Sequence, residues 1–367
     1  MHSIRGRVWI IGLLSALLCF VTAQAEEEKI LNLYTWADYT GEDTVANFEE
    51  RTGIKINHDV YDSNEMLETK LLTGNSGYDV VMPTAFFLER QIQAGVFQKL
   101  DKTQLSNYGN LDADTLERMA SHDPNNEYGL PYMWGTTGIG YNEARVREVF
   151  PDAPVDSWDM LFDPEVISRL AECGVSFLDA PSEVFATALN YLGRDPNSED
   201  PDDLKAAEAL LAKVRPYIRY FHSQQYMDDL ATGEICVAMS WSGDVFWAGR
   251  RAAESGNGVE LSYSIPQEGA IIWFDAMAIP SDAPHPGNAH LFLNYLMEPE
   301  VIAGISNFIF FANGNAASVE FIDEQILGNP VIYPPAAVKA TLFPARVHSA
   351  RFQRLQTRAW TRFKTGH

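Results

Sequence analysis

The sequence has few cysteines, few basic residues and only one long apolar run. Three cysteines occur among 367 residues, and 27 lysines and arginines stand against 50 aspartates and glutamates, which gives a formal net charge of -23. A field of this sign repels nucleic acid and anionic membranes. The same charge suits a small cationic ligand, and it equally suits an acidic protein that is simply soluble.

Sequence motifs of the common enzyme classes are missing. The chain has no G-x-S-x-G, no H-E-x-x-H, no Walker loop and no cysteine–histidine set with family spacing. The glycines of YGLPYMWGTTGIGYN, residues 128–142, do not make a nucleotide loop, because no G-x-G-x-x-G lies between a strand and a helix. We therefore expect no cofactor and no metal. A two-carboxylate exported hydrolase using Asp244 and Asp275 is a remote alternative.

The one long apolar run lies at the start of the chain. Basic residues precede an apolar stretch from Val8 to Val21, and Ala-Gln-Ala follows at positions 23–25. This order predicts a cleaved secretory signal peptide over residues 1–25. A lipoprotein anchor at Cys19 is disfavoured because a leucine, not a small residue, precedes it. We expect an exported protein.

Two cysteines, Cys173 and Cys236, remain after the signal peptide. An even number in an exported chain favours a disulfide, because that compartment oxidises thiol pairs. Two separate buried thiols are the alternative, and the spacing leaves it open.

Strand-like and helix-like segments alternate along the chain. KILNLYTW, GEDTVANFEERTG, IKINHDVYD, NEMLETKLLTGNSG and YDVVMPT give a β-α-β-α-β order, which predicts an α/β sheet covered by helices. Gly53 and Gly77 stand where the two helices should end. A second unit of this kind follows, and the chain returns through IIWFDAMAIP. We expect two lobes: residues 26–136 with about 265–310, and about 137–264 with about 311–367.

Carboxylates and aromatic rings stand together where four strands end, in WADY, DAPSEVF, WSGDVFW and WFDAMAIP. Singly, each such place is more often structural, and Asp244 in particular is a candidate helix cap. Ligands of α/β sheets bind beyond the carboxyl ends of strands. Aromatic faces attract an organic cation by about 0.5–2 kcal/mol, and carboxylates supply the charge-assisted hydrogen bonds that a buried ammonium needs. The four places together predict a site for an organic ammonium.

These segments, with FLERQIQAGVFQKLDK, LPYMWGTTGIGYN, YMDDLATGEICVAMSW and NPVIYPPA, resemble the periplasmic polyamine-binding proteins of ABC importers, particularly the putrescine-binding branch. The resemblance runs from about Lys29 to Gly366. It implies a two-lobed, hinged periplasmic-binding-protein fold of type II with the ligand in the inter-lobe cleft. It also implies a periplasmic monomer that passes a diamine or polyamine to an inner-membrane ABC permease without chemical change.

The same resemblance implies roles for individual residues. Four rings would form the aromatic box, namely Trp36, Tyr39, Trp241 and Trp273. The ammonium partners would be Asp38, Asp244 and Asp275, with a contribution from Glu183, and Asp244 and Asp275 would serve opposite ends of the ligand. The family also implies a disulfide between Cys173 and Cys236.

Four positions of the expected site depart from the putrescine pattern. They are Ala37 and Thr84, where serine is usual, Phe86 in place of a small residue, and Phe311 in place of tyrosine. Because one methylene changes affinity by only about 1 kcal/mol, such changes can re-rank putrescine, cadaverine, agmatine and spermidine. Another organic cation as the ligand, or a polyamine-sensing receptor, remains an alternative.

Overall fold

A computed structural model describes residues 27–366 of the protein. The predicted signal peptide, with Cys19, lies outside the described residues. Within residues 27–366, none of the helices is both long and apolar enough to span a bilayer.

One continuous, mixed sheet runs through the described part of the chain, with strand order β2-β1-β3-β9-β4-β7-β5-β6. Three further strands pair beside this path: β8 and β10 with β4, and β11 with β9. The bounds are β1 (Ile30–Trp36), β2 (Lys55–Tyr61), β3 (Val80–Val81), β4 (Gly129–Asn142), β5 (Val175–Phe177), β6 (Tyr220–Phe221), β7 (Val237–Trp241), β8 (Leu261–Ser264), β9 (Ile271–Ala278), β10 (Ala312–Asn313) and β11 (Phe343–Pro344).

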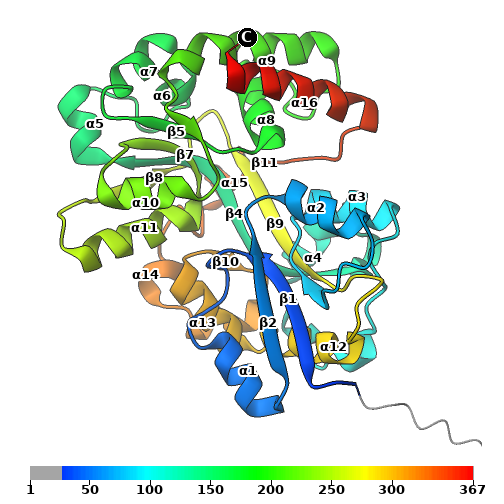
Figure 1. Ribbon diagram of the computed structural model, residues 1–367. Coiled ribbons are helices and arrows are strands. Elements are labelled where there is room, and N and C mark those ends of the chain that lie inside the picture. The colour runs from blue at the N-terminus through cyan, green and yellow to red at the C-terminus, as the bar shows by residue number, and fades with distance from the viewer. Residues whose placement is uncertain (1–26, 367) are drawn as a thin grey trace, which may run out of the picture.

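Three hydrophobic clusters, two in one lobe and one in the other, form the cores of the two lobes, drawn below and above in Figure 1. The first lobe carries α1 (Thr44–Thr52), α2 (Asn64–Leu72), α3 (Ala85–Gln93), α4 (Ala113–Met119), α12 (Pro286–Leu296), α13 (Pro299–Ile309) and α14 (Glu324–Leu327), with the short 3-10 turns η1 (Lys102–Gln104), η2 (Tyr108–Asn110), η3 (Pro124–Asn126) and η5 (Ala316–Phe321). The second carries α5 (Glu143–Val149), α6 (Asp159–Phe162), α7 (Pro164–Leu170), α8 (Pro181–Tyr191), α9 (Pro201–Val214), η4 (Arg215–Tyr217), α10 (Gln225–Thr232), α11 (Ser242–Ser255) and α16 (Ala350–Thr365). α15 (Ala336–Lys339) lies on the connection to α16.

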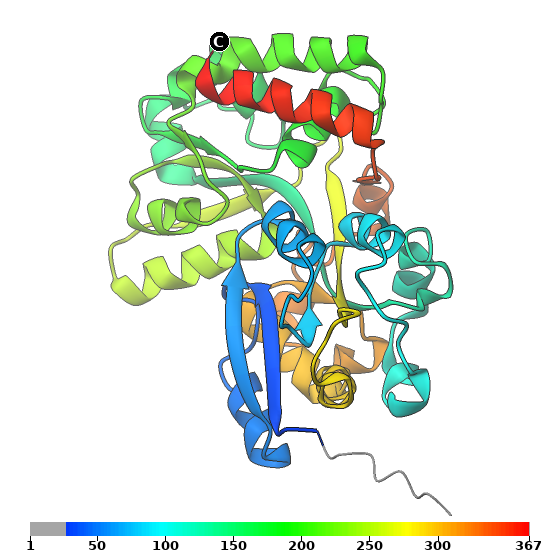
Figure 2. The ribbon, with the colours of Figure 1, turned by 45° about the vertical axis from the view of Figure 1, so that its right-hand side comes forward.

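The strands β4 and β9 connect the two lobes (Figures 1 and 2). β4 pairs antiparallel with β9 from Gly129 to Thr137 and with β7 from Thr137 to Tyr141. The glycines of β4 allow close packing: a Cβ on Gly135 would lie 2.7 Å from the Trp273 ring. A bulkier residue at 135 would therefore displace a side chain of the inter-lobe region.

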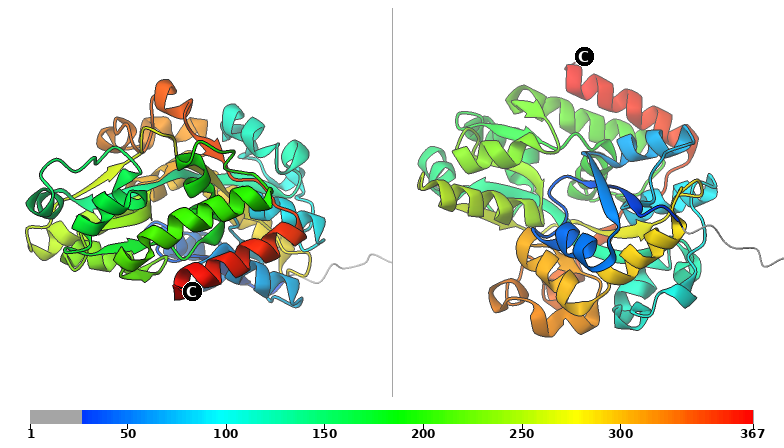
Figure 3. Two further views of the ribbon diagram at one scale, coloured as in Figure 1. Left: turned by 90° about the horizontal axis from the view of Figure 1, so that it is seen from above. Right: turned by 60° about the horizontal axis from the view of Figure 1, so that its bottom comes forward.

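Within the C-terminal segment, residues 311–332 pack differently from the expected lobe division. β10 pairs with β4 beside Trp134, and Ile322, Ile326 and Ile332 pack in a first-lobe core. After β11 pairs with β9, the chain crosses, and α16 packs on α8 and α9 of the second lobe (Figure 3, left). Residues 311–332 therefore pack with the first lobe, because their apolar side chains find their partners there.

Helix ends agree with the sequence at one predicted position and differ at another. α1 ends before Gly53, whose φ is +71°, and the Gly53 N–H donates to the carbonyl of Glu49. α2 ends earlier than expected, at Leu72, with Gly74 at φ +74° rather than Gly77 closing the turn.

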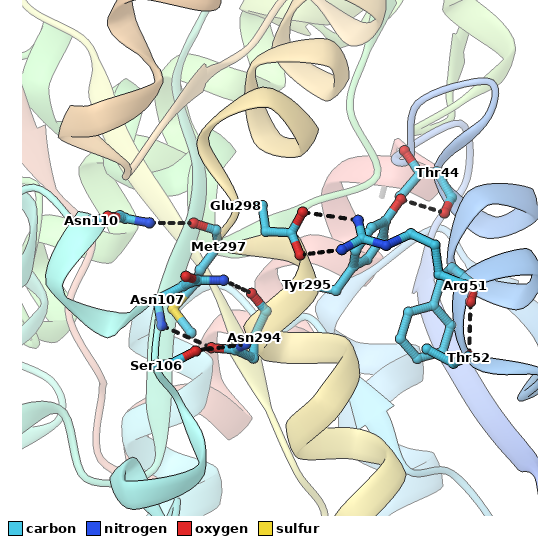
Figure 4. A network of polar contacts seen from close by, with 11 residues as sticks. Thr44, Arg51, Thr52, Ser106, Asn107, Asn110, Asn294, Tyr295, Met297 and Glu298 are labelled. Atoms are coloured by element: carbon cyan, nitrogen blue, oxygen red, sulfur yellow. Dashed lines mark hydrogen bonds and ion pairs between the residues drawn. The ribbon is translucent and has the colours of Figure 1, made fainter.

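Polar side chains fasten α12 to its neighbours at the far end of the first lobe (Figure 4; Figure 3, right). Asn294 Oδ1 accepts from the backbone N–H of Asn107 at 2.9 Å, and the Asn107 amide donates back to the Asn294 carbonyl at 2.9 Å. Beyond α12, both oxygens of Glu298 accept from the guanidinium of Arg51 in α1, at 2.8 and 2.9 Å. These contacts hold the base of the lobe rigid, remote from the inter-lobe region.

Candidate ligand-binding site

A cavity lined by residues of both lobes lies between them, a place where small-molecule sites are commonly found. Its walls contain ten of the twelve predicted site residues: Trp36, Ala37, Tyr39, Thr84, Glu183, Trp241, Asp244, Trp273, Asp275 and Phe311. Six further residues complete the lining: Tyr61, Asp62, Asn64, Ser223, Gln224 and Met227. None of these described lining residues is a lysine or an arginine, whereas four are carboxylates. The cavity is therefore acidic.

The first-lobe wall is built at the ends of β1 and β3. Trp36 ends β1, and its indole N–H donates to the carbonyl of Met82 at 2.9 Å, which fixes the ring between the two strands. Thr84 follows β3 and forms a bridge with Asp275 of β9. Three strands thus converge on this wall.

Asp275 is buried and held by two hydroxyl donors. Tyr39 Oη donates to its Oδ2 at 2.6 Å, and Thr84 Oγ1 donates to its Oδ1 at 2.7 Å. The Thr84 hydroxyl itself accepts from the amide of Asn64 at 2.9 Å, so its proton is directed at the carboxylate. Burial raises the pKa of Asp275 to about 7, against the two hydrogen bonds, and the charge of Glu183 adds to the rise.

Glu183, near the start of α8, is the second buried carboxylate. It accepts hydrogen bonds from the hydroxyl of Thr137 in β4 and from the indole N–H of Trp241, the latter at 3.1 Å. Burial raises the pKa of Glu183, although both hydrogen bonds oppose the shift. Trp241 is thereby held against the carboxylate with its ring facing the cavity.

Asp244 lies in the first turn of α11, where the position before the helix is occupied by Trp241. The suggestion that Asp244 caps this helix is therefore wrong: its carboxylate accepts from the hydroxyl of Tyr226 in α10 instead. Loss of water raises the pKa of Asp244 to about 7, and the charge of Asp38 contributes to the rise. A cation in the cavity would lower the pKa of Asp244 again, because it favours the ionised carboxylate.

Aromatic rings from both lobes meet around the cavity. Trp36 and Trp241 lie edge to face with ring centroids 5.8 Å apart. Phe311 packs against Trp273 at 5.2 Å and against Tyr39 at 5.8 Å. Such rings provide negative faces for a cation and apolar contact for methylene groups.

Two of the predicted site residues do not line the cavity. Asp38 is exposed, at a φ of +51°, and reaches the site only through its charge on Asp244. Phe86 lines a narrow side chamber that shares Trp36, Glu183 and Ser223 with the main cavity. A direct ammonium contact for Asp38 stays a prediction.

Sequence reasoning missed the six other lining residues and the side chains behind them. Tyr61 ends β2 as Trp36 ends β1, so the rule of strand ends applied to it equally. Ser223, Gln224 and Met227 follow β6, which has only two residues and gives a weak pattern. Nothing local in the sequence points to Tyr226, which reaches Asp244 from another helix.

The two cysteines of the described chain form a disulfide between Cys173 and Cys236, with Cα atoms 5.4 Å apart. The pairing confirms the prediction. It joins the residues after α7 to those before β7, the strand that ends at Trp241. The disulfide thereby anchors one wall of the cavity.

Within residues 27–366, no group of three or more histidine, cysteine, aspartate or glutamate side chains is arranged to hold a metal ion. An acidic, aromatic cavity between two lobes joined by two strands suits capture of an organic cation. These features define a two-lobed solute-binding protein of the hinged periplasmic type.

Comparisons with known proteins agree with that class. The model of the bacterial extracellular solute-binding protein family matches residues 43–329, and the chain belongs to this family. It is 53% identical to the putrescine-binding periplasmic protein PotF of Escherichia coli, over 98% of this chain and 99% of that protein. It is 44% identical to a putrescine/agmatine-binding protein of Pseudomonas aeruginosa, over 92% of each.

A solved structure supports the fold. A putative spermidine/putrescine ABC transporter protein from Listeria monocytogenes superposes with a TM-score of 0.83 at 30% identity, covering 92% of this chain and all of that one. The relatives are substrate-binding proteins of transport systems and not enzymes. The alternative of a hydrolase at Asp244 and Asp275 is therefore set aside.

Proposed function

We propose that this protein captures a polyamine in the periplasm, putrescine foremost, and delivers it to the permease of an ABC importer. The observation that carries the proposal is the cavity itself: carboxylates from both lobes, aromatic walls and no basic residue in the lining. Relatives named for putrescine at 53% and 44% identity support the choice of ligand. A predicted signal peptide supports the compartment.

In this proposal the two ends of the diamine bind to different lobes. Asp275, oriented by Tyr39 and Thr84, accepts one ammonium, and Asp244, oriented by Tyr226, accepts the other. The methylene chain lies between the rings of Trp36, Tyr39, Trp241 and Trp273. Glu183 adds charge beside Trp241, and Asp38 adds charge near Asp244 from outside the lining.

The lobe division that we propose follows the packing of the side chains. The first lobe comprises residues 27–136 with about 272–332, and the second about 139–264 with 350–366. A bridging dication stabilises the closed arrangement of the lobes, because it interacts with both walls only when they face each other. The permease recognises the closed shape; a polyamine-sensing receptor would use the same cavity and differ only in its partner.

Isothermal titration of the ligand-stripped mature protein tests the proposal. Putrescine, cadaverine, agmatine and spermidine are compared, with γ-aminobutyrate as a ligand that carries one ammonium. We expect micromolar or tighter binding of a diamine and no binding of γ-aminobutyrate. Asp244→Asn should weaken diamine binding at least tenfold, whereas Asp156→Asn, an exposed aspartate of the same lobe, should not. Absence of binding by every polyamine contradicts the proposal.

A longer polyamine is a second candidate ligand, and one observation favours it. Glu65 lines the side chamber together with Asp62 and Phe86. The neighbouring guanidinium of Arg90 is already paired with Glu68, at 2.5 and 2.6 Å. Burial raises the pKa of Glu65 to about 7, as does the charge of Glu183. The side chamber thus offers an acid to a further ammonium.

Glu65→Gln separates the two candidates. If a triamine extends into the side chamber, the variant should lose spermidine affinity about tenfold and keep its putrescine affinity. Glu42→Gln, which changes an exposed acid of the same lobe, is the matched control. Unchanged spermidine affinity in Glu65→Gln would mean that the side chamber is not used, and it would leave putrescine as the proposed ligand.

A further inference from the structure

Outside the cavity, one arginine is held between aromatic rings of both lobes. Arg250 lies on α11 of the second lobe, and its guanidinium carbon is 4.1 Å from the ring centroid of Trp247 on the same helix. It is also 4.4 Å from the ring of Phe308 on α13 and 5.4 Å from that of Phe310, both of the first lobe. The rings of Trp247 and Phe308 are themselves 5.3 Å apart. We call these four residues the aromatic clasp.

The clasp is held by stacking and not by hydrogen bonds. In the described part of the chain, Arg250 Nε and Trp247 Nε1 are buried without a hydrogen-bond partner. Glu254 lies 3.9 Å from Arg250 Nε, beyond hydrogen-bond distance, and is largely exposed. A planar, weakly hydrated guanidinium gains from stacking on rings. Separation of the lobes would return both N–H groups to water, so the contact can form and break repeatedly.

The clasp is built on the same segments of the chain as the walls of the cavity. Arg250 stands six residues after Asp244 on the same helix, and Phe310 immediately precedes Phe311, a lining residue. At the start of α11, Gly243 is pressed on the Phe311 ring, which a Cβ would approach to 2.6 Å. Figure 1 shows α11 and α13 facing each other across the two lobes. A separation of the lobes that opens the cavity would therefore also open the clasp.

We propose that Arg250 is a positioning residue for ligand capture: it stabilises the closed lobes, and so sets the affinity and the residence time, without touching the ligand. The choice of probe rests on the proposed function. Because apparent affinity falls in proportion to the population of the competent state, loss of one desolvated cation–π stack should weaken binding about tenfold. The effect should appear in the dissociation rate, because the ligand enters between open lobes and leaves only after the clasp has opened.

Stopped-flow and equilibrium binding of putrescine test the inference with Arg250→Met, which keeps the length of the side chain and removes its charged plane. We expect about tenfold weaker binding through faster dissociation, with association unchanged, and partial recovery with Arg250→Lys. Arg251→Met is the matched control, because Arg251 is exposed and pairs with Asp228 within the second lobe. Combined with Phe308→Ala, the Arg250→Met effect should be less than additive.

Unchanged dissociation in Arg250→Met, or the same loss in Arg251→Met, overturns the inference while the proposed function stands. Small-angle scattering provides a readout that needs no ligand: the free Arg250→Met protein should be more extended on average than the wild type. If no polyamine binds the wild type, the proposed function fails, and the scattering comparison alone decides on the clasp. Equal scattering of the two free proteins would then overturn it.

Discussion

Lowering the pH from 8 to 6 should release the proposed ligand from the cavity. The pKa of Asp244 and that of Asp275 are each raised to about 7, in both cases mainly because burial disfavours the charged carboxylate. An ammonium binds the ionised form. Protonation of the two aspartates therefore competes directly with capture.

The magnitude follows from the two pKa values. A carboxylate of pKa about 7 is about 90% ionised at pH 8 and about 10% ionised at pH 6. Each aspartate thus reduces the affinity about tenfold across this range, and the two together reduce it about 100-fold. The raised pKa of Glu183 acts in the same direction. An alkylammonium with a pKa near that of lysine, about 10.4, stays charged throughout, so the ligand itself contributes nothing to the change.

Titration calorimetry in buffers of different ionisation enthalpy measures the effect. At pH 7 each aspartate is about half protonated, so binding should release about one proton in total. Asp244→Asn should release about half as many protons and show about half the logarithmic pH dependence. An affinity that stays constant from pH 8 to pH 6, with no proton released, would refute the reasoning, because both carboxylates would then be ionised in the free protein.

Three further predictions concern the groups that support the site and the fold. Tyr226→Phe removes the donor that lowers the pKa of Asp244. Putrescine affinity at pH 7 should therefore fall several-fold, and the fall of affinity with decreasing pH should begin at a higher pH. An unchanged pH dependence in calorimetry would contradict this. Replacing both Cys173 and Cys236 by alanine removes a bridge across 63 residues. The free energy of unfolding, measured by urea titration, should fall by about 4 kcal/mol. A loss below about 1 kcal/mol would show that the bridge barely constrains the unfolded chain. Asn294→Ala removes the side-chain acceptor of the half-buried Asn107 backbone N–H (Figure 4) and should lower the unfolding free energy by about 1 kcal/mol with diamine affinity unchanged. Weakened binding would mean that the base of the lobe is coupled to the cavity.

The order of strands and helices and much of the cavity could be predicted from the sequence, because both follow from short-range pattern. Trp36 was expected in the site because it stands at a strand end, and Thr84 because of the family resemblance, and both line the cavity. Trp241, Asp244 and Asp275 were found by the same rule. Tyr61 obeys it as well and was overlooked.

Other features depend on contacts between distant parts of the chain. The partner of Asp244 is a hydroxyl from α10, and Asp38, although next to a lining tyrosine, is turned outward by a positive φ. Residues 311–332 were expected in the second lobe, but β10 pairs in the first. No local pattern encodes such pairings, because each depends on the apolar surface that another part of the chain offers to the segment.

The sequence by itself therefore determined the class of fold and the cationic type of the expected ligand, since strand ends and the combination of acids with aromatic rings are local and compositional. The cysteine number only favoured a disulfide, and it is the fold that brings Cys173 and Cys236 together. Only the tertiary structure decided which carboxylates are buried and how their pKa values are raised, because burial depends on what the rest of the chain places around a group. The aromatic clasp has the same origin. Arg250, Phe308 and Phe310 meet only where two lobes touch.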